Sequence, residues 1–442
     1  MKKSSLFISV FILIIICPVM AQKGDSIPGK SDSLKGKSDN MATKVKDCQP
    51  KEIQDILFKK RKPKPVDTSR VFRFFILPYI AYSPTKGFQL GAGGSLTWYF
   101  GKSPITNQSA ASAMAEFTSK NQKLFQFKSN VYTNENKWFL QGDWRYYIYS
   151  LPTFGLGSGY NDPVPAIDGY PKDSTAQATW DQSYLVLFRW LRLHEIFSYR
   201  IIENLYIGIG YHFDLHYEIE DTQLKLDSST PVITPHYSYS KLHGFDSSRY
   251  ATSGISLNFV YDSRDNLVNP YKGYYANVNY RLNTNWLGSS EPSSQLWAEF
   301  RTYVGLEKKM PRHLIAFWLY GGFQVSGTTP YFDLWATGFD QMNSSGRGYL
   351  QGRWRGEHLV YGEVEYRFPI TRCSQVLGGV LFLNASTASS RDQDVNLFKY
   401  IRPAGGFGLR VMVSKATRTN VLIDFTIAEK EFGIYFSAQE IF

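Results

Sequence analysis

The sequence predicts an all-β fold, a transmembrane antiparallel β-barrel of about sixteen strands. From Val71 to Phe442, apolar and polar residues alternate with a period of two in one segment after another. Aromatic residues make up 16% of the chain, yet the mean hydropathy is slightly negative. Beyond the N-terminal residues, no segment is apolar over the roughly 20 residues that a membrane-spanning helix needs. An apolar, aromatic outside around a polar interior accounts for all three observations.

The first 21 residues have the order of a secretory signal peptide. Lys2 and Lys3 precede an apolar run over residues 6–17, and small residues follow up to Ala21, after which we expect cleavage. A lipoprotein signal ending at Cys17 is the weaker interpretation, because the residue before it is Ile16 rather than a small one. The chain is therefore expected to be exported.

Residues 22–70 form a basic, polar segment that reads as a disordered tether. The whole chain has a formal net charge of +11, and much of the excess lies here. Nucleic acid is an unsuitable target for an exported chain, so the segment is either solvated or bound to anionic lipid head groups. Within it, "KEIQDILFKK" (51–60) has apolar residues at helical spacing. This short helix is either an inert spacer or a piece that binds a partner or plugs the barrel.

After cleavage the chain keeps two cysteines, Cys48 and Cys373. Two are too few for a disulfide framework, although an exported chain can form disulfides. Any bridge between them is expected to be incidental to the fold.

Individual strands show which face points where. In "KWFLQGDWRYYIY" (137–149), Trp138 and Trp144 share one face, and Asp143 and Arg145 share the other. The second face is too polar for the core of a β-sandwich, because buried charges without partners are costly. A closed barrel resolves the conflict, since it pairs every backbone group and places lipid outside and water inside.

Sixteen such segments follow one another along the chain. They begin near Val71, Phe88, Ser109, Lys123, Lys137, Trp180, Glu203, Ala251, Lys272, Ser294, His313, Glu357, Ser374, Arg402, Arg418 and Phe432. The long connections, around 150–179, 218–250 and 328–356, follow odd-numbered strands, as expected when one barrel end faces the outside and the other the periplasm. A β-propeller is the soluble alternative, but the repeat near forty residues that it needs is not found.

Candidate chemistry in the sequence is sparse. In "HFDLH", His212, Asp214 and His216 share a strand face, but alternate residues lie about 6.8 Å apart, so polar lumen lining is preferred to a metal site. Ser158 in "GLGSG" misses the G-x-S-x-G nucleophile elbow and its strand-to-helix setting. The sequence predicts no catalytic residues, no metal and no cofactor.

Several motifs carry a family resemblance. They are "VYDSRDNLVNPYKGYY" (260–275), "GRGYLQGRWRG" (346–356), "GEVEYRFPI" (362–370), "GGFGLRV" (405–411) and the terminal Phe442. In this order they resemble the surface-antigen barrel of the BamA/TamA superfamily, and "FGLGSGY" (154–160) is similar to a glycine-rich loop of its shorter members. The resemblance spans nearly all of residues 71–442.

This resemblance implies a sixteen-stranded barrel whose sixth outer loop folds back into the lumen. In the family, the Arg-Gly-aromatic tip of that loop, matched here by Arg347, Gly348 and Tyr349, docks on acidic residues of the inner wall. The alternation of the following strand points Glu363, Glu365 and Arg367 inward, so a charge-assisted pair between Arg347 and Glu365 is expected. A solvated basic loop is the alternative.

One position departs from the family pattern. Members commonly carry a second acid in a Phe-x-Asp pattern, whereas this chain has Phe382, Leu383 and the neutral Asn384. An amide accepts only through its oxygen. We therefore expect the loop to rest mainly on Glu365.

Two further groups of residues are expected to be structural. A periplasmic turn is formed by Asp262, Arg264, Asp265, Pro270 and Gly273. On the last strand, an apolar face carries the aromatic insertion signal, with Gly433 weakening the seam between the first and last strands. That face consists of Phe432, Ile434, Phe436, Ala438 and Phe442, and Glu440 is expected near the periplasmic rim.

The family's periplasmic POTRA domains have no counterpart, because residues 23–70 are too few and too polar to bury such a core. We expect an outer-membrane protein that takes part in protein assembly or translocation with partner chains. The alternatives are a passive channel and a structural subunit of an envelope complex; an outer-membrane hydrolase lacks a triad. Expected partners are outer-membrane lipids and envelope or assembly-machine proteins, with no nucleic acid and no small-molecule cofactor.

Overall fold

The computed structural model describes residues 51, 53, 72–83, 85–101, 106–159, 183–229, 231–415, 418–437 and 440–442. The expected signal peptide and nearly all of the tether lie outside the described residues. Cys373 is disulfide-bonded. The other two cysteines, Cys17 and Cys48, lie outside the described residues.

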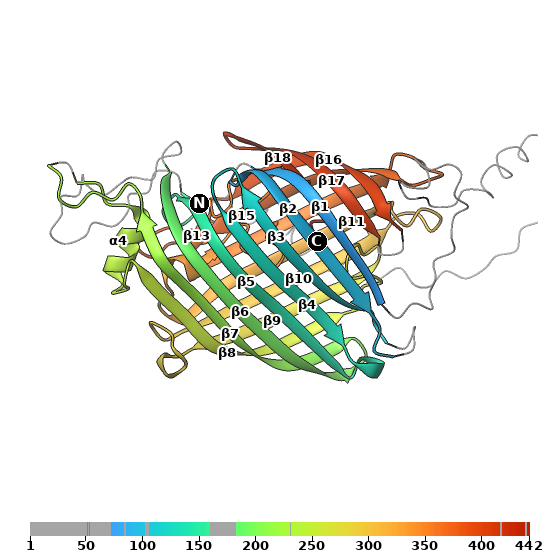
Figure 1. Ribbon diagram of the computed structural model, residues 1–442, viewed down its shortest axis with the longest axis horizontal. Helices are drawn as coiled ribbons and strands as arrows, with labels where there is room; N and C mark the ends of the chain where they lie inside the picture. The colour runs from blue at the N-terminus through green and yellow to red at the C-terminus, as the bar shows by residue number, and fades with distance from the viewer. Residues whose placement is uncertain are drawn as a thin grey trace, which may run out of the picture. The chain divides into compact units, whose positions relative to one another are not determined.

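Sixteen strands form one antiparallel sheet in chain order (Figure 1), which confirms the predicted fold class. The strands are β1 (Phe72–Ser83), β2 (Gly87–Trp98), β3 (Ser109–Thr118), β4 (Lys123–Tyr132), β5 (Trp138–Thr153), β6 (Tyr184–Ile202), β7 (Leu205–Asp221), β8 (Arg249–Asp262), β9 (Gly273–Asn283), β10 (Ser293–Gly305), β11 (Leu314–Gly327), β14 (His358–Pro369), β15 (Leu377–Ala388), β16 (Arg402–Ser414), β17 (Thr419–Ala428) and β18 (Glu431–Ser437). They reproduce the predicted order and lie close to the predicted positions.

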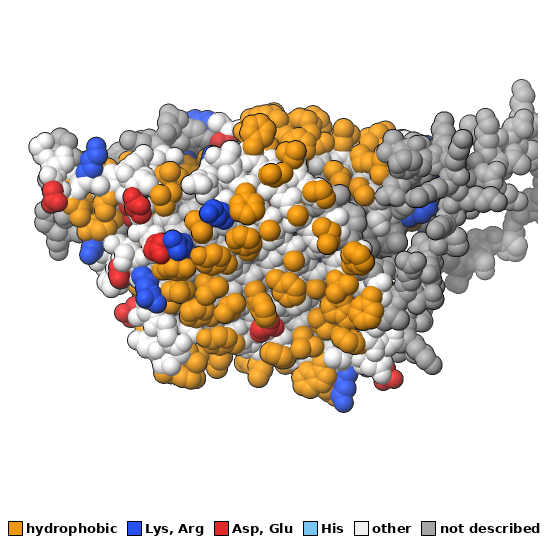
Figure 2. All heavy atoms as spheres, in the orientation of Figure 1, with side chains coloured by type: hydrophobic (Ala, Val, Ile, Leu, Met, Phe, Trp, Pro, Cys, Tyr) orange, Lys and Arg blue, Asp and Glu red, His pale blue; other side chains and the backbone are white. Residues whose placement is uncertain are grey.

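The two faces of the wall differ as the alternation predicted. On β5, Trp138 and Trp144 are exposed on the outer face, whereas Arg145 is buried on the inner face. Figure 2 shows hydrophobic side chains covering the wall, with charged groups gathered mainly toward the end that carries α4. No helix among the described residues is long and apolar enough to cross a membrane. The apolar band lies on strands, which is the arrangement of a lipid-facing barrel wall.

The two ends of the barrel carry different connections. We call the end that carries the 154–183, 222–248 and 328–357 connections the long-loop end, and the opposite end the short-turn end. The connections contain η1 (Asn134–Asn136), α4 (Pro235–Leu242), η3 (Asn285–Leu287), η4 (Tyr331–Asp333), β12 (Trp335–Ala336) and β13 (Arg355–Gly356). Residues 328–357, called loop 6 below, join β11 to β14, and β12 pairs with β13 inside this loop.

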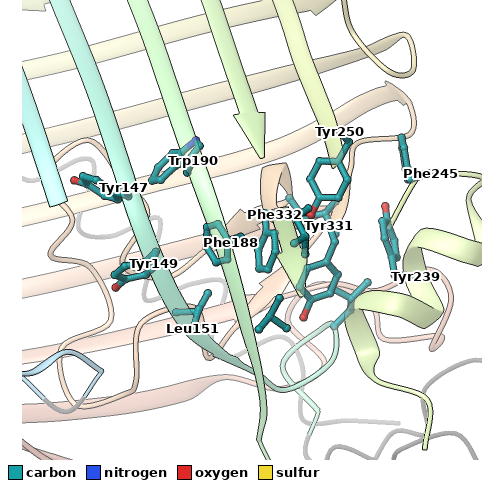
Figure 3. Close-up of a cluster of buried hydrophobic side chains, with 14 of the residues drawn as sticks. Tyr147, Tyr149, Leu151, Phe188, Trp190, Tyr239, Phe245, Tyr250, Tyr331 and Phe332 are labelled. Atoms are coloured by element: carbon teal, nitrogen blue, oxygen red, sulfur yellow. The ribbon is translucent and has the colours of Figure 1, made fainter. Parts of the chain in front are cut away.

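Aromatic side chains fill the inside of the barrel near the long-loop end (Figure 3). Phe188 of β6 stacks on Phe332 of η4 with 4.2 Å between ring centroids. Tyr239 of α4 meets Tyr331 edge to face at 5.9 Å. Because these rings are buried together with others of β5 and β8, the long loops pack onto the inner wall.

The sheet has one discontinuity. Strands β1 and β18 lie next to each other, but each occupies an end of the strand order, and no register pairs them among the described residues. β1 has 12 residues and β18 has seven. We call this junction the seam.

Candidate functional site: loop 6 and the seam

Arg347 holds the tip of loop 6 inside the barrel. Its guanidinium donates to Glu363 and Glu365 of β14 and, at 2.6 Å, to Asp424 of β17. It also lies 3.7 Å from the ring centroid of Phe382. Arginine suits this position because its planar fork serves several carboxylates at once and stacks on an aromatic ring.

The carboxylates around Arg347 are shared with two further arginines. Arg367 donates to Glu365 at 2.6 Å, and Arg410 donates to Asp424 at 2.5 Å. Burial alone would lower the pKa of Arg347, but Glu363, Glu365 and Asp424 outweigh it and raise that pKa well above its usual value. The loop is therefore bound by a permanently charged group in a nearly water-free network.

The sequence-based interpretation of this network was incomplete. Besides Glu365, which does contact Arg347, the structure brings Glu363 and Asp424 to the same guanidinium. Asn384 takes a different part, because its amide N–H donates to the backbone carbonyl of Arg347 at 3.0 Å. A carboxylate has no N–H to make this bond. The signal for Asp424 was present, since alternation along β17 places it on the inner face.

The two residues after Arg347 fit closely against the wall. Gly348 has a φ of +109°, and a Cβ there would lie 2.7 Å from Cβ of Ala404 and 3.2 Å from Cβ of Ala428. Only glycine allows both this conformation and this approach. Tyr349 is buried, and its hydroxyl donates to the carbonyl of Pro403 at 2.8 Å.

Loop 6 is also bonded to both sides of the seam. On the β18 side, the Leu350 N–H donates to Glu431 at 2.7 Å, and the Gly348 N–H donates to the Tyr435 hydroxyl at 3.3 Å. On the β1 side, the Gln351 N–H donates to the Thr85 hydroxyl, in the turn after β1, at 3.0 Å. The loop thus bridges two edges that have no ladder between them.

The glycine-rich segment after β5 supports the base of loop 6. The Gly157 N–H donates to the carbonyl of Arg355 at 2.7 Å, and Arg353 lies 4.0 Å above the ring of Phe154. Ser158 is fully buried, and its hydroxyl is bonded to backbone carbonyls of Ala388 and Tyr400. Its contacts are those of a structural serine.

The C-terminal residues correct one expectation. Phe432 and Phe436 are exposed on the outer face, and Gly433 faces inward. Phe442, however, is buried inside the barrel, with its ring centroid 5.2 Å from that of Trp318.

Polar contacts hold this tail in place. Arg367 donates to the Phe442 carbonyl oxygen at 3.0 Å, and the Ser344 hydroxyl of loop 6 donates to the carbonyl of Ile441 at 3.0 Å. Glu440 is also buried, and it accepts from Arg410 at 2.9 Å and from Asn420, the second residue of β17, at 2.5 Å. Period-two reasoning failed here because β18 ends at Ser437, so Glu440 and Phe442 are not part of the strand.

The turn motif between β8 and β9 forms a compact polar unit at the short-turn end. Asp262 accepts two bonds from Arg264, at 2.8 and 2.7 Å, and Arg264 lies 4.4 Å above the ring of Tyr275. Asp265 accepts from the Tyr271 N–H and from Arg418 of the β16–β17 turn, at 2.9 and 2.8 Å.

Two residues of the same motif shape its backbone. Pro270 is buried in the turn, and Gly273 has a φ of +107°. The motif therefore contacts a second turn and contains no arrangement suited to acid–base chemistry.

The histidine-rich face of β7 lines the lumen. Asp214 accepts from Arg192 at 2.7 Å and from Arg281 at 3.0 Å, and lies 2.7 Å from a ring nitrogen of His194. His212 and His216 are buried on the same face. No cluster of three or more His, Cys, Asp or Glu suited to a metal occurs among the described residues. This face is an ion-pair network that joins β6, β7 and β9.

Comparison with known proteins identifies relatives of this architecture. Residues 196–438 match the model of the Omp85 superfamily domain. BamA from Haemophilus ducreyi lacking POTRA domains 1–3 is similar, with 14% identity over 84% of this chain and 71% of that chain and a TM-score of 0.50. CdiB from Escherichia coli is similar, with 10% identity over 85% of this chain and 63% of that chain and a TM-score of 0.50. Among curated proteins there is no match.

Proposed function

Because the chain belongs to the Omp85 superfamily, and a barrel of this family is integral to the outer membrane, we propose that it inserts or translocates other outer-membrane proteins through the seam. Partner chains supply the capture of clients in this proposal. The protein acts without catalytic chemistry. Its strand edges pair with an incoming strand, and the opened seam lets the client pass into the membrane or across it.

The seam is the observation that carries the proposal. An edge strand presents a row of unpaired N–H and C=O groups, to which an incoming strand can add. β1 has 12 residues against seven in β18, so part of the β1 edge has no counterpart across the seam. Pro78 lies within β1, which fits an edge position because proline cannot donate to a ladder.

Loop 6 would set how easily the seam opens. Its bonds to Glu431, Tyr435 and Thr85 bridge the two edges through side chains. Arg347 anchors the same loop to β14 and β17. Separating β18 from β1 therefore requires breaking a few polar contacts and no ladder, while the rest of the wall stays intact.

A passive channel is one of the alternative functions considered above. The interior argues against it, because loop 6, the aromatic cluster and the C-terminal tail all place buried side chains inside the wall. Conductance of the purified protein in planar bilayers tests the channel alternative directly.

Site-specific photocrosslinking in cells tests the proposal. A photoreactive residue replaces Ile76, on the outer face of β1, and a matched control replaces Leu257, on the outer face of β8; both side chains are exposed. We expect the Ile76 probe to trap unfinished outer-membrane β-barrel chains and the Leu257 probe to trap none. Identical products at both positions, together with steady conductance, would favour the channel.

A further inference from the structure

The Glu195 carboxylate lies on the lipid-facing side of the wall, away from both ends of the barrel. Glu195 belongs to β6, where Leu193 and Phe197, its neighbours on the same face, are exposed at 39% and 49%. Inward-facing residues of the same strand, such as Phe188 and Trp190, are buried. Alternation therefore points Glu195 out of the barrel, away from the ion pairs of the lumen.

Glu195 lies near the middle of the apolar band. Toward the short-turn end, Trp138 and Tyr199 form an aromatic pair 5.0 Å apart. Toward the long-loop end, Arg189 and Glu218 form an exposed ion pair at 2.8 Å. A tilted strand rises about 2.5 Å per residue along the membrane normal, so Glu195 lies about 10 Å from the level of Tyr199 and about 15 Å from that of Arg189. The total matches the roughly 25 Å height of the apolar band.

Neighbouring strands form a recess for this carboxylate. Gly142 of β5 pairs with Glu195, and a Cβ at Gly142 would lie 2.9 Å from the Glu195 carboxylate and 2.7 Å from the Ser129 hydroxyl. The Trp144 indole N–H donates to Glu195 at 2.7 Å. We call Ser129, Gly142, Trp144 and Glu195 the wall notch. Glycine thus leaves room where the carboxylate lies.

The wall notch is not explained by the barrel's own stability. A carboxyl group facing hydrocarbon is costly unless it is paired. Among the described residues, Trp144 is the one hydrogen-bond partner of Glu195, whereas Asp214 inside the lumen has four. Ionisable residues at membrane depth generally mark a site with a partner.

We propose that the wall notch docks a membrane-spanning segment of another protein that carries a lysine or arginine at mid-membrane depth. Charge complementarity selects this occupant. Lipid head groups lie about 10–15 Å away, at the membrane surfaces. A symmetric second copy would bring a second Glu195 carboxylate instead of a cation. The proposal does not depend on client insertion, because the seam lies on other strands.

Binding of designed peptides to the full-length protein in phosphatidylcholine vesicles provides the first test. One probe is a single-span Leu/Ala helix with a central lysine, and the other is the same helix with a central leucine. Binding of each helix is measured by energy transfer to a dye on the barrel. We expect the lysine helix to bind at least tenfold more tightly, and Glu195→Gln to abolish this preference. The matched control is Glu218→Gln, which changes an exposed carboxylate of the same wall and should leave the preference intact.

A photoreactive residue at Leu193 in cells provides the second test. The expected product joins Leu193 to a peptide within a membrane-spanning segment that contains Lys or Arg, and its yield falls at least tenfold with Glu195→Gln but not with Glu218→Gln. Equal binding of both helices, products with lipid alone, or a product between two copies of this chain would each overturn the proposal. Heat-modifiable gel mobility shows that each variant is folded.

Discussion

The wall from β5 to β7 and the seam are held together in different ways. β5, β6 and β7 have 16, 19 and 17 residues, and their registers run along nearly the whole strands. At the seam, no register pairs seven-residue β18 with 12-residue β1 in the part of the chain that the structure describes. The wall is closed by backbone ladders, whereas at the seam backbone N–H groups of loop 6 donate to side chains of β18 and of the turn after β1. The β5–β7 wall and the seam are therefore held by different kinds of contact.

This difference has an energetic consequence. Each backbone hydrogen bond contributes about 0.5–1.5 kcal/mol net in water, and leaving one unmade within lipid costs several kcal/mol. Separating β5 from β6 would break a whole ladder. Separating β18 from β1 breaks the few bonds that loop 6 makes to Glu431, Tyr435 and Thr85. We therefore expect separation at the seam to cost less free energy than separation within the β5–β7 wall.

Proline substitutions should separate the two regions most strongly. Leu191→Pro in β6 removes an N–H from a strand paired on both sides, which leaves unpaired backbone in the lipid band and costs several kcal/mol. Ile76→Pro in β1 lies two residues from Pro78, so its N–H points the same way as the one that Pro78 already lacks. We expect the first variant to be lost from the outer membrane and the second to accumulate folded. Heat-modifiable gel mobility measures both, and equal loss would contradict the edge character of β1.

Removing the anchor of loop 6 should have the next largest effect. Arg347→Ala leaves Glu363, Glu365 and Asp424 buried without their shared cation, which should cost about 3–5 kcal/mol. We expect a lower Tm and protease cleavage within loop 6. Adding Glu363→Gln and Asp424→Asn should restore part of the stability.

Arg281→Ala is the matched control for Arg347→Ala. Arg281 is also buried and pairs with Asp214 at 3.0 Å, but Arg192 and His194 each lie 2.7 Å from that carboxylate as well. The wall around β7 should therefore tolerate this loss better, with loop 6 still resistant to protease. Cleavage of loop 6 in both variants to the same extent would show that the anchor is not specific.

Weakening the bridge itself should act on β18 alone. Glu431→Gln with Tyr435→Phe removes a charge-assisted acceptor and the hydroxyl that accepts from Gly348. We expect the opening free energy of β18, measured by amide hydrogen exchange, to fall by about 1–3 kcal/mol. Exchange in β6 should stay unchanged; a parallel rise there would mean that the wall opens as one unit.

The strands were predictable for a reason that does not extend to the loop contacts. Lipid outside and water inside impose a period of two on every strand, so the faces of Trp144, Glu363 and Glu365 follow from their positions alone. The choice of Asp424 as a further partner of Arg347 depends on how loop 6 crosses the lumen, which alternation does not encode. The predicted outward position of Phe442 was wrong for a related reason, since this residue follows the end of β18. The recognised motifs predicted where loop 6 docks, but the full set of partners of Arg347 depends on side-chain packing in the lumen.

Acid should affect the seam through the C-terminal tail, with the smallest effect. Burial alone would raise the pKa of Glu440, but Arg410 and Arg367 outweigh it and hold that pKa below its ordinary value. The carboxylate therefore contributes stability that is fully present above its ordinary pKa of about 4.3 and is lost as the pH falls through the lower folded pKa. We expect protection of β18 from hydrogen exchange to be constant from pH 7 to about 5. It should decline below about 4, before protection of β6 does. Glu440→Gln should lower protection by about 1 kcal/mol at neutral pH and flatten the acid response. An unchanged acid response in this variant would mean that Glu440 does not control the tail.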